Sequence, residues 1–224
     1  MEEKFRSTPL FRGMTEEDID GLMRCLDTRE QTFQKGEVIL LEGSPTEQIG
    51  VVLSGTVLVQ MGDVWGNNSV LNRIGPGGSF AEAYACVPGE PLMVSVLAAE
   101  ESRVLLLSVS QILSPCSQIC PRHTQLIRNL LTLCAEKDLH LSRRMLHTGP
   151  KSIRKRVMSY FSECVKRSGS FAFEIPYNRQ QLADYLNVER SALSNELSLM
   201  QRDGIIRYER NRFELCDADH LQLP

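Results

Sequence analysis

Apolar residues near the end of the chain follow helical spacing in two consecutive segments. Residues 178–186 form the first segment, and residues 190–200 form the second after a three-residue gap. Asn178 followed three residues later by Gln181 is a capping-box pattern, which marks the start of the first helix. The second segment has one apolar stripe at i, i+4 and i+7, made by Leu193, Leu197 and Met200. The pattern predicts two helices joined by a tight turn.

The second predicted helix carries a polar face beside its apolar stripe. The residues on that face can all make hydrogen bonds, and they are Arg190, Ser191, Ser194, Asn195 and Ser198. Such a face suits a helix that lies in the DNA major groove, where side chains bond to base edges. Ordinary surface helices show the same pattern, so the segment that follows decides between the two interpretations.

Two short strand-like runs, 205–209 and 212–216, follow this helix directly. Arg210 and Asn211 form the predicted turn between them. A hairpin in this position is a wing, and Arg207, Arg210 and Arg212 would place positive charge on it where DNA phosphates lie. The sequence therefore predicts a winged helix-turn-helix.

The N-terminal half has a different pattern, with short apolar runs separated by glycine-rich turns between residues 15 and 110. Many short strands at regular spacing indicate an antiparallel roll or sandwich. The predicted strands are 37–41, 50–53, 56–61, 69–74, 93–98 and 103–107.

One long helix is predicted over residues 121–146. Its apolar seam has coiled-coil spacing and consists of Ile127, Leu130, Cys134, Leu141 and Met145. Such a helix buries its face against the roll, against a second copy of itself, or against both, which favours a dimer. Gly149–Pro150 then breaks the chain before a helix over about 151–166, and this break is a candidate hinge.

Charge divides unevenly along the 224 residues. The chain as a whole has a net charge of −3, but residues 151–224 carry 12 basic and 10 acidic side chains, which gives +2. Residues 1–150 carry the balance of −5, which fits a basic reading unit joined to an acidic regulatory unit. Seven cysteines at irregular positions argue against a disulfide framework and for a reducing cytoplasm. Neither a signal peptide nor a membrane span is expected.

Several short motifs occur in a characteristic order. They are Lys35-Gly36-Glu37, Glu42-Gly43, Leu53-Ser54-Gly55 and the run 74–82, followed by the winged helix-turn-helix. In this order the chain resembles the Crp/Fnr superfamily of bacterial transcription regulators over nearly its whole length. The resemblance implies an α+β fold with an antiparallel β jelly-roll sensor at 1–120, a dimerisation helix at 121–148, and a winged helix-turn-helix domain at 149–224. It also implies a homodimer on a two-fold symmetric DNA site.

The sensor departs from the pattern of cyclic-nucleotide binders in this family. In those proteins a Gly-Glu pair opens a phosphate cassette, and an Arg about ten residues later neutralises the cyclic phosphate. Here Ala81 precedes Glu82, and the Arg position falls at Leu92. The run between Arg73 and Arg103 contains no Lys or Arg. A buried phosphate without a cation is costly, so cyclic AMP is an improbable ligand and the effector is unknown. The candidate effector pocket comprises Phe80, Ala81, Glu82, Ala83, Leu92 and Met93.

The reading helix departs from the family pattern as well. Many relatives carry a Glu and, four residues later, an Arg; here Ser191 and Asn195 occupy those places. Arg190 suits guanine and Asn195 suits adenine. We predict base reading by Arg190, Ser191, Ser194 and Asn195. DNA-backbone contacts are predicted for Arg179, Gln180, Arg210 and Arg212.

Other chemistries find weaker support. Cys116, Cys120 and His123 form a compact group that suits a metal or a redox-switched disulfide, but two cysteines packed beneath the roll explain the spacing better. No signature assigns a metal, and Cys86, His123, His140 and His147 are unsupported candidates for haem. No catalytic motif occurs and every histidine follows the roll, so an enzyme is not expected. The remaining alternative is an interaction module that does not bind DNA.

The sequence thus predicts a cytoplasmic, dimeric, sequence-specific regulator. Its expected partners are double-stranded DNA, a second copy of the chain, RNA polymerase and an unidentified small molecule. We expect no membrane partner.

Overall fold

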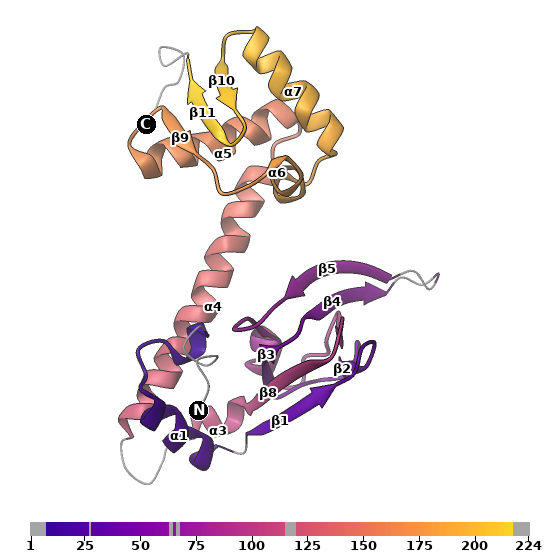
Figure 1. The fold of residues 1–224 in the computed structure, drawn as a ribbon, viewed down its shortest axis with the longest axis vertical. Coiled ribbons are helices and arrows are strands. Elements are labelled where there is room, and N and C mark those ends of the chain that lie inside the picture. Colours follow the sequence, from indigo (N-terminus) through magenta and orange to yellow (C-terminus); the bar gives the residue numbers. More distant parts are fainter. Residues whose placement is uncertain (1–7, 27, 63–64, 66–67, 115–119, 217–224) are drawn as a thin grey trace. The chain divides into compact units, whose positions relative to one another are not determined.

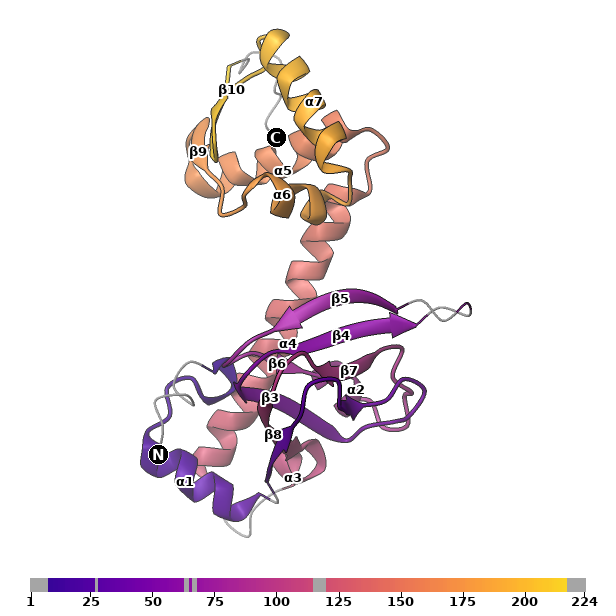
Figure 2. The same cartoon turned by 45° about the vertical axis from the view of Figure 1, so that its right-hand side comes forward.

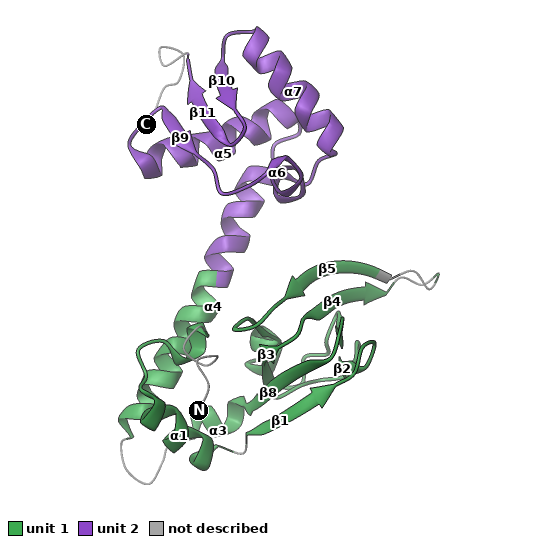
Figure 3. Cartoon of the chain, viewed as in Figure 1, with its two compact units in different colours: residues 1–136 green, residues 137–224 purple. Residues whose placement is uncertain are grey.

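The computed structural model describes residues 8–26, 28–62, 65, 68–114 and 120–216. These residues fall into two compact units, 1–136 and 137–224, each treated separately below (Figure 3). The boundary between the units lies inside the longest helix, α4, which spans Pro121–Thr148 (Figure 1). No helix among the described residues is long and apolar enough to cross a membrane.

The first unit contains two four-stranded antiparallel sheets, with strand orders β1-β8-β3-β6 and β2-β7-β4-β5 (Figure 2). Eight strands in two such sheets make a jelly roll, which confirms the predicted fold class. The strands are β1 (Arg29–Phe33), β2 (Val38–Leu40), β3 (Gln48–Ser54), β4 (Val57–Gly62), β5 (Asn68–Ile74), β6 (Ser79–Phe80), β7 (Ser95–Ala98) and β8 (Ser102–Ser108).

The middle of strand β3, between Gln48 and Ser54, is apolar because both of its faces are covered. Val52 packs with Val57 and Val96 of the opposite sheet. Its neighbours Val51 and Leu53 point the other way, into a second core shared with the helices of this unit. A continuous apolar run is what a strand covered on both sides requires.

The described residues of this unit also form four short helical elements, and none was predicted. They are the 3₁₀ turn at Pro9–Phe11, α1 (Glu16–Cys25), α2 (Glu82–Ala85) and α3 (Val109–Leu113). The expectation of strands from about residue 15 is wrong at α1, which a capping box between Thr15 and Asp18 begins. Its buried residues Ile19 and Leu22 leave its other faces polar, so the strand-like apolar signal begins only later.

Helix α4 confirms the predicted long helix and divides its apolar residues between two faces. Leu126, Leu130 and Leu133 are buried. Leu126 and Leu130 join the core beneath the roll. Leu130 was predicted to share the seam with Ile127, and the structure separates the two. Ile127 remains 37% exposed. Exposed large apolar side chains on α4 also include Leu131, Leu139, Leu141, Met145 and Leu146.

The second unit packs three helices against a three-stranded sheet. Its elements are the end of α4, α5 (Ile153–Ser168), β9 (Ala172–Glu174), α6 (Arg179–Leu186), α7 (Arg190–Arg202), β10 (Ile206–Glu209) and β11 (Arg212–Leu215). The sheet order is β10-β11-β9, so the predicted hairpin gains a third strand that the sequence analysis did not identify. The core is aromatic at its centre, where the rings of Phe161 and Phe213 lie 4.6 Å apart.

The Gly149–Pro150 break is held on both sides within the second unit. Arg156 of α5 donates from Nε to the Pro150 carbonyl at 2.8 Å. Before the break, Arg144 of α4 donates from Nη2 to the Asp184 carbonyl at 2.9 Å. The last turns of α4 are therefore hydrogen-bonded to α6, and the Gly149–Pro150 turn is hydrogen-bonded to α5. The sequence suggested a hinge at this turn.

Candidate DNA-binding surface

Helix α7 presents the predicted polar face to solvent because the side chains of its apolar stripe are buried in the core. Leu193, Leu197 and Met200 are all 0% exposed. Arg190, Ser191, Asn195 and Ser198 are exposed and Ser194 is partly buried. The Ser198 hydroxyl donates to the Ser194 carbonyl at 3.0 Å, which leaves Arg190, Ser191 and Asn195 as the most available donors.

The turn between α6 and α7 sets the direction of α7. Helix α6 begins with the predicted capping box, in which the Asn178 side chain accepts from the Gln181 backbone and the Gln181 side chain accepts from the Asn178 backbone, both at 2.9 Å. It ends at Asn187, which adopts a left-handed φ of 53°. Asparagine tolerates this conformation better than most residues, so the chain reverses within a few residues and α7 starts at Arg190.

Two arginines hold α7 and the end of α6 in place. Arg154 of α5 forms two ion pairs with α7 and its C-terminal cap. Its Nε lies 2.6 Å from Oε1 of Glu196, and its Nη2 lies 2.8 Å from Oδ2 of Asp203. Arg156 donates to the carbonyls of Leu186 and Asn187 at 3.1 and 2.8 Å, which satisfies carbonyls at the end of α6. Arg154 and Arg156 therefore use their positive charge within the fold. The sequence alone does not distinguish such arginines from those that are free to face DNA.

Arg179, predicted to contact the DNA backbone, is packed against the wing. Its guanidinium carbon lies 5.1 Å from the Tyr208 ring centroid and 6.0 Å from that of Phe213. Burial lowers the pKa of Arg179, with the nearby positive charge of Arg190 adding to the effect. Stacking of this kind joins α6 to the hairpin, so Arg179 positions the wing relative to α6.

Gln180 is exposed on α6, but its amide is partly engaged. Its Nε2 donates to Oδ1 of Asp184 one turn later, at 2.8 Å. Gln180 also lines a surface hollow between α6 and α7 that includes Arg190. It is therefore placed beside the reading helix, next to an acidic side chain.

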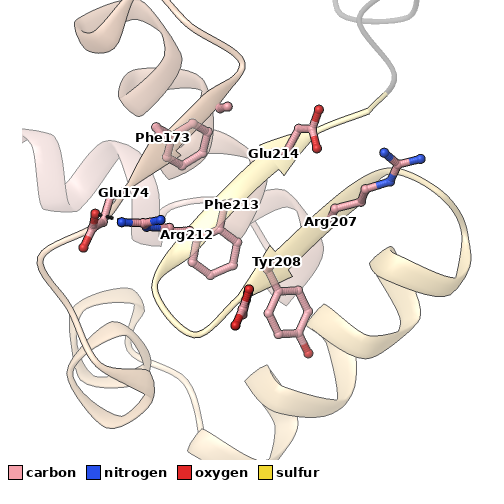
Figure 4. A pocket seen from close by; sticks show the side chains of 9 residues that line it. Phe173, Glu174, Arg207, Tyr208, Arg212, Phe213 and Glu214 are labelled. Carbon is pink, nitrogen blue, oxygen red and sulfur yellow. Dashed lines mark ion pairs between the residues drawn. The ribbon is translucent and has the colours of Figure 1, made fainter.

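The outer face of the wing sheet alternates positive and negative charge. Arg207 pairs across the strands with Glu214, and Arg212 lies between Glu209 and Glu174. The Arg212 Nε is 3.6 Å from Oε2 of Glu174 (Figure 4). Two arginines thus face three glutamates, and the face as a whole is not basic. The arginines are visible in the sequence, but β9, which brings Glu174 beside Arg212, was not predicted.

Arg210 differs from the other wing arginines because it lies at the hairpin tip. It is exposed and has a left-handed φ of 55°. It lines a surface hollow together with Asn178 and Arg179 at the start of α6. Of the basic residues on the wing, Arg210 is the best placed to meet a phosphate.

Three of the predicted effector residues follow one another at the end of β6 and the start of α2. Phe80 on β6 is buried, and its ring fills the space that Gly50 leaves by lacking a side chain. Ala81 adopts a left-handed φ of 65°, a conformation that favours glycine. Glu82, the first residue of α2, is only 4% exposed.

The remaining effector candidates do not supply the missing cation. Ala83 is exposed on α2. Leu92 is buried at 2% exposure and its backbone pairs with Ser44, while Met93 is 66% exposed. The buried side chain at the position where the resemblance implies a phosphate-binding Arg is therefore apolar.

The cysteine and histidine group is only partly described. Cys116 lies outside the described residues, Cys120 is partly buried, and His123 on α4 is 7% exposed. Across the described part of the chain, no cluster of three or more His, Cys, Asp or Glu side chains suits a metal ion. The metal and redox alternatives at Cys116, Cys120 and His123 stay predictions.

His147, one of the haem candidates, has a structural environment that the sequence did not indicate. It is buried at 3% exposure where α4 meets α5. One ring nitrogen lies 2.5 Å from Oε2 of Glu163 and the other 3.1 Å from the Ser159 hydroxyl. Both ring nitrogens are thus engaged by α5, so His147 fixes the end of α4 within the second unit.

Comparison with known proteins agrees with this arrangement of a roll and a winged helix-turn-helix. Residues 30–118 match the cyclic nucleotide-binding domain, and residues 155–223 match the Crp-like helix-turn-helix domain. The chain belongs to the Crp/Fnr family of transcription regulators, whose helix-turn-helix binds DNA. This assignment goes against the alternative of an interaction module without DNA binding.

Two distant relatives and one solved structure match along nearly their full length. The chain is 24% identical to the cyclic AMP receptor protein of Thermus thermophilus, over 97% of this chain and 96% of the relative. It is 20% identical to a CRP-like cAMP-activated global transcriptional regulator of Mycobacterium tuberculosis, over 99% and 98%. Among solved structures, CprK complexed with OCPA has a TM-score of 0.58 at 13% identity, covering 91% of this chain and 92% of that one.

Proposed function

We propose that this protein is a homodimeric regulator that recognises a two-fold symmetric DNA site through α7 and responds to an effector other than cyclic AMP. The exposed polar face of α7, fixed by its fully buried apolar stripe, is the observation that carries the proposal. Its sensor would comprise residues 1–120, its dimerisation helix 121–148 and its DNA-binding domain 149–224.

Base reading is assigned to Arg190, Ser191, Ser194 and Asn195. Arg190 lies at the N-terminus of α7, the end that enters the major groove in helix-turn-helix proteins. Its guanidinium can donate two hydrogen bonds to guanine, and the Asn195 amide both donates to and accepts from adenine. Ser191 and Ser194 have hydroxyls that can donate or accept, so they fit either base.

Contacts to the DNA backbone are assigned chiefly to Arg210 and Gln180. Arg210 is exposed in the turn of the hairpin, where no glutamate is paired with it across the strands. Arg179 and Arg212 contribute charge near the backbone, while each also makes a contact within the unit. Phosphate contacts position a protein on DNA without reading its sequence, so these residues set affinity and register.

Dimerisation is assigned to the exposed apolar line along α4. Ile127, Leu131, Leu141 and Met145 are all at least 37% exposed. Their spacings of 4, 10 and 4 follow a heptad seam, with Cys134 and Asp138 at the intervening seam positions. A second copy of α4 would cover this line and leave the roll-facing residues Leu126 and Leu130 undisturbed.

Selection of bound duplexes from a random pool tests the proposed mode of DNA recognition. We expect enrichment of an inverted repeat whose half-sites are centred about one helical turn apart, roughly 10 base pairs, because two symmetric heads meet the same face of the duplex. A variant with Arg190→Ala and Asn195→Ala provides the control and should enrich no motif. An asymmetric single motif, or the same motif with the control, would contradict the proposal.

Titration with cyclic AMP tests the proposed sensor. We expect no saturable heat up to about 1 mM ligand, since Leu92 offers no charge to a buried phosphate. A cyclic AMP receptor protein titrated under identical conditions serves as the positive control. Stoichiometric binding at micromolar concentration would show that another residue neutralises the phosphate and would overturn this part of the proposal.

The cell biology follows from the DNA-binding role. A bacterial regulator that binds chromosomal DNA works in the cytoplasm, and its output is expected to pass through RNA polymerase. The similar proteins are regulators of transcription, and no catalytic role is proposed. Sensing through Cys116, Cys120 and His123 is the second candidate for the effector step.

A further inference from the structure

The last turns of α4 carry two different sets of side chains within the compact unit 137–224. Leu141 and Met145, which form the C-terminal half of the line assigned to dimerisation, are more than half exposed. Arg144 is partly buried and His147 is buried, although both lie within a few residues of that line. Successive residues of a helix differ by about 100° around its axis, so the two sets occupy neighbouring faces. The geometry between this part of the dimer line and the reading helix is therefore set inside one unit.

Arg144 joins the inner of these two faces to the end of α6. Its Nε donates to the Tyr185 carbonyl at 3.2 Å, and its Nη2 donates to the Asp184 carbonyl at 2.9 Å. Both carbonyls lie in the last turn of α6, where the helix dipole places negative partial charge. One planar guanidinium thus makes two charge-assisted hydrogen bonds, which fix the direction of α6 as well as its distance from α4.

The packing around Arg144 restricts the end of α6 further. The Tyr185 ring centroid lies 6.0 Å from that of His147 on α4 and 5.3 Å from that of Tyr160 on α5. His147 is itself hydrogen-bonded to Glu163 of α5. Only residues 187–189 separate the end of α6 from Arg190, the first residue of the reading helix. Contacts that hold the end of α6 therefore also place the start of α7.

We propose that Arg144 determines which half-site spacing this regulator accepts, by holding the reading helix at one distance and angle from the dimer line. The inference rests on the proposed function, in which two copies meet along α4 and read an inverted repeat. One extra base pair separates the half-sites by about 3.4 Å more and turns them by about 35° relative to each other. A reading helix bonded to the dimer helix can follow this change only if the Arg144 contact breaks or the DNA deforms. Arg144 acts through α6, so it is a positioning residue.

Binding to duplexes of altered spacing tests the inference. The two selected half-sites are placed one base pair closer together or one further apart, and fluorescence anisotropy measures binding of the full-length protein. For the wild type we expect roughly 10- to 100-fold weaker binding than at the selected spacing, because charge-assisted hydrogen bonds must break. For Arg144→Ala we expect this penalty to shrink to about threefold or less, because the reading helix can turn without breaking them.

Base preference distinguishes a positioning role from general damage to the fold. At the selected spacing, duplexes with single substitutions should rank in the same order for Arg144→Ala as for the wild type, since the polar face of α7 is unchanged. Arg143→Ala is the matched control, because Arg143 is the preceding residue on α4, is 56% exposed and has its Nε 3.8 Å from Oε1 of Glu163. This control should keep the wild-type spacing penalty. If Arg144→Ala folds poorly, Arg144→Lys, which has one amine in place of the fork, should show an intermediate penalty.

The outcomes separate failure of this inference from failure of the proposed function. Selection of no inverted repeat would overturn both. An inverted repeat bound equally well by the wild type at all three spacings would overturn the inference alone, as would a full spacing penalty in Arg144→Ala. Equal loss of affinity at every spacing, together with an altered ranking of bases, would show that Arg144 only supports the fold and would also overturn it.

Discussion

Replacing Arg190 by alanine is expected to weaken binding to the selected DNA site by about 1–3 kcal/mol, or roughly 5- to 150-fold. Arg190 begins α7 and is exposed, so its removal should leave the core stripe of Leu193 and Leu197 intact. The loss should concentrate at one base pair in each half-site, because a guanidinium that donates two hydrogen bonds to guanine discriminates against other bases. Fluorescence anisotropy with the selected duplex and with single-substitution duplexes measures this directly.

Arg167→Ala supplies the matched control for this variant. Arg167 is an exposed arginine in the last turn of α5 of the same unit, so the charge change is identical while α7 is untouched. It should bind the selected duplex within about twofold of the wild type. If Arg190→Ala weakens unrelated DNA as much as the selected site, Arg190 contacts phosphates and the assigned base-reading role is wrong.

Introducing charge into the exposed line of α4 is expected to dissociate the dimer. With Leu141→Asp and Met145→Asp, four apolar side chains are lost from each dimer interface. At about 1.5 kcal/mol for each buried side chain, the dimer loses about 6 kcal/mol, which raises its dissociation constant about 10⁴-fold. Both side chains are more than half exposed in the single chain, so the monomer should remain folded. Sedimentation velocity at micromolar concentration should then show a monomer.

Leu139→Asp tests whether the position of the charge matters. Leu139 is 52% exposed and lies on the same helix, but about 120° around its axis from Ile127. This variant should sediment as a dimer, and its circular dichroism should match that of the double variant. A double variant that stays dimeric, or a control that dissociates equally, would show that the seam is placed on the wrong side of α4.

The elements found from the sequence are those whose apolar pattern has one clear explanation. The spacing of Leu193, Leu197 and Met200 fits one buried face of a helix. It predicted α7 correctly. Strand β3 was found because its buried middle is a continuous apolar run. Strand β1, with the sequence Arg-Glu-Gln-Thr-Phe, is mostly exposed and pairs with β8 through its backbone. Its side chains carry no burial signal, so sequence periodicity could not identify it.

The candidate site was predicted less completely because its charges depend on partners distant in the sequence. Arg154 meets Glu196 from 42 residues away, and Arg212 meets Glu174 from 38 residues away. Counting arginines along the chain cannot distinguish those that brace helices from those that face DNA. The distinction needs the register of β9 against β11, and β9 is too short to show a pattern. Residues on a helix surface, such as Arg190 and Asn195, need no such partner and were placed by periodicity alone.

The alternating charges on the wing also bear on how the regulator searches a chromosome. Non-specific binding comes almost entirely from cations that displace counterions from the DNA backbone. A wing whose Arg207 and Arg212 are matched by glutamates displaces few of them, which leaves Arg210 as its main contribution. The protein would then leave random DNA quickly, and bulk chromosomal sequence would sequester little of it. A small number of copies per cell could keep a specific site occupied, since competition from the many non-specific sites is weak.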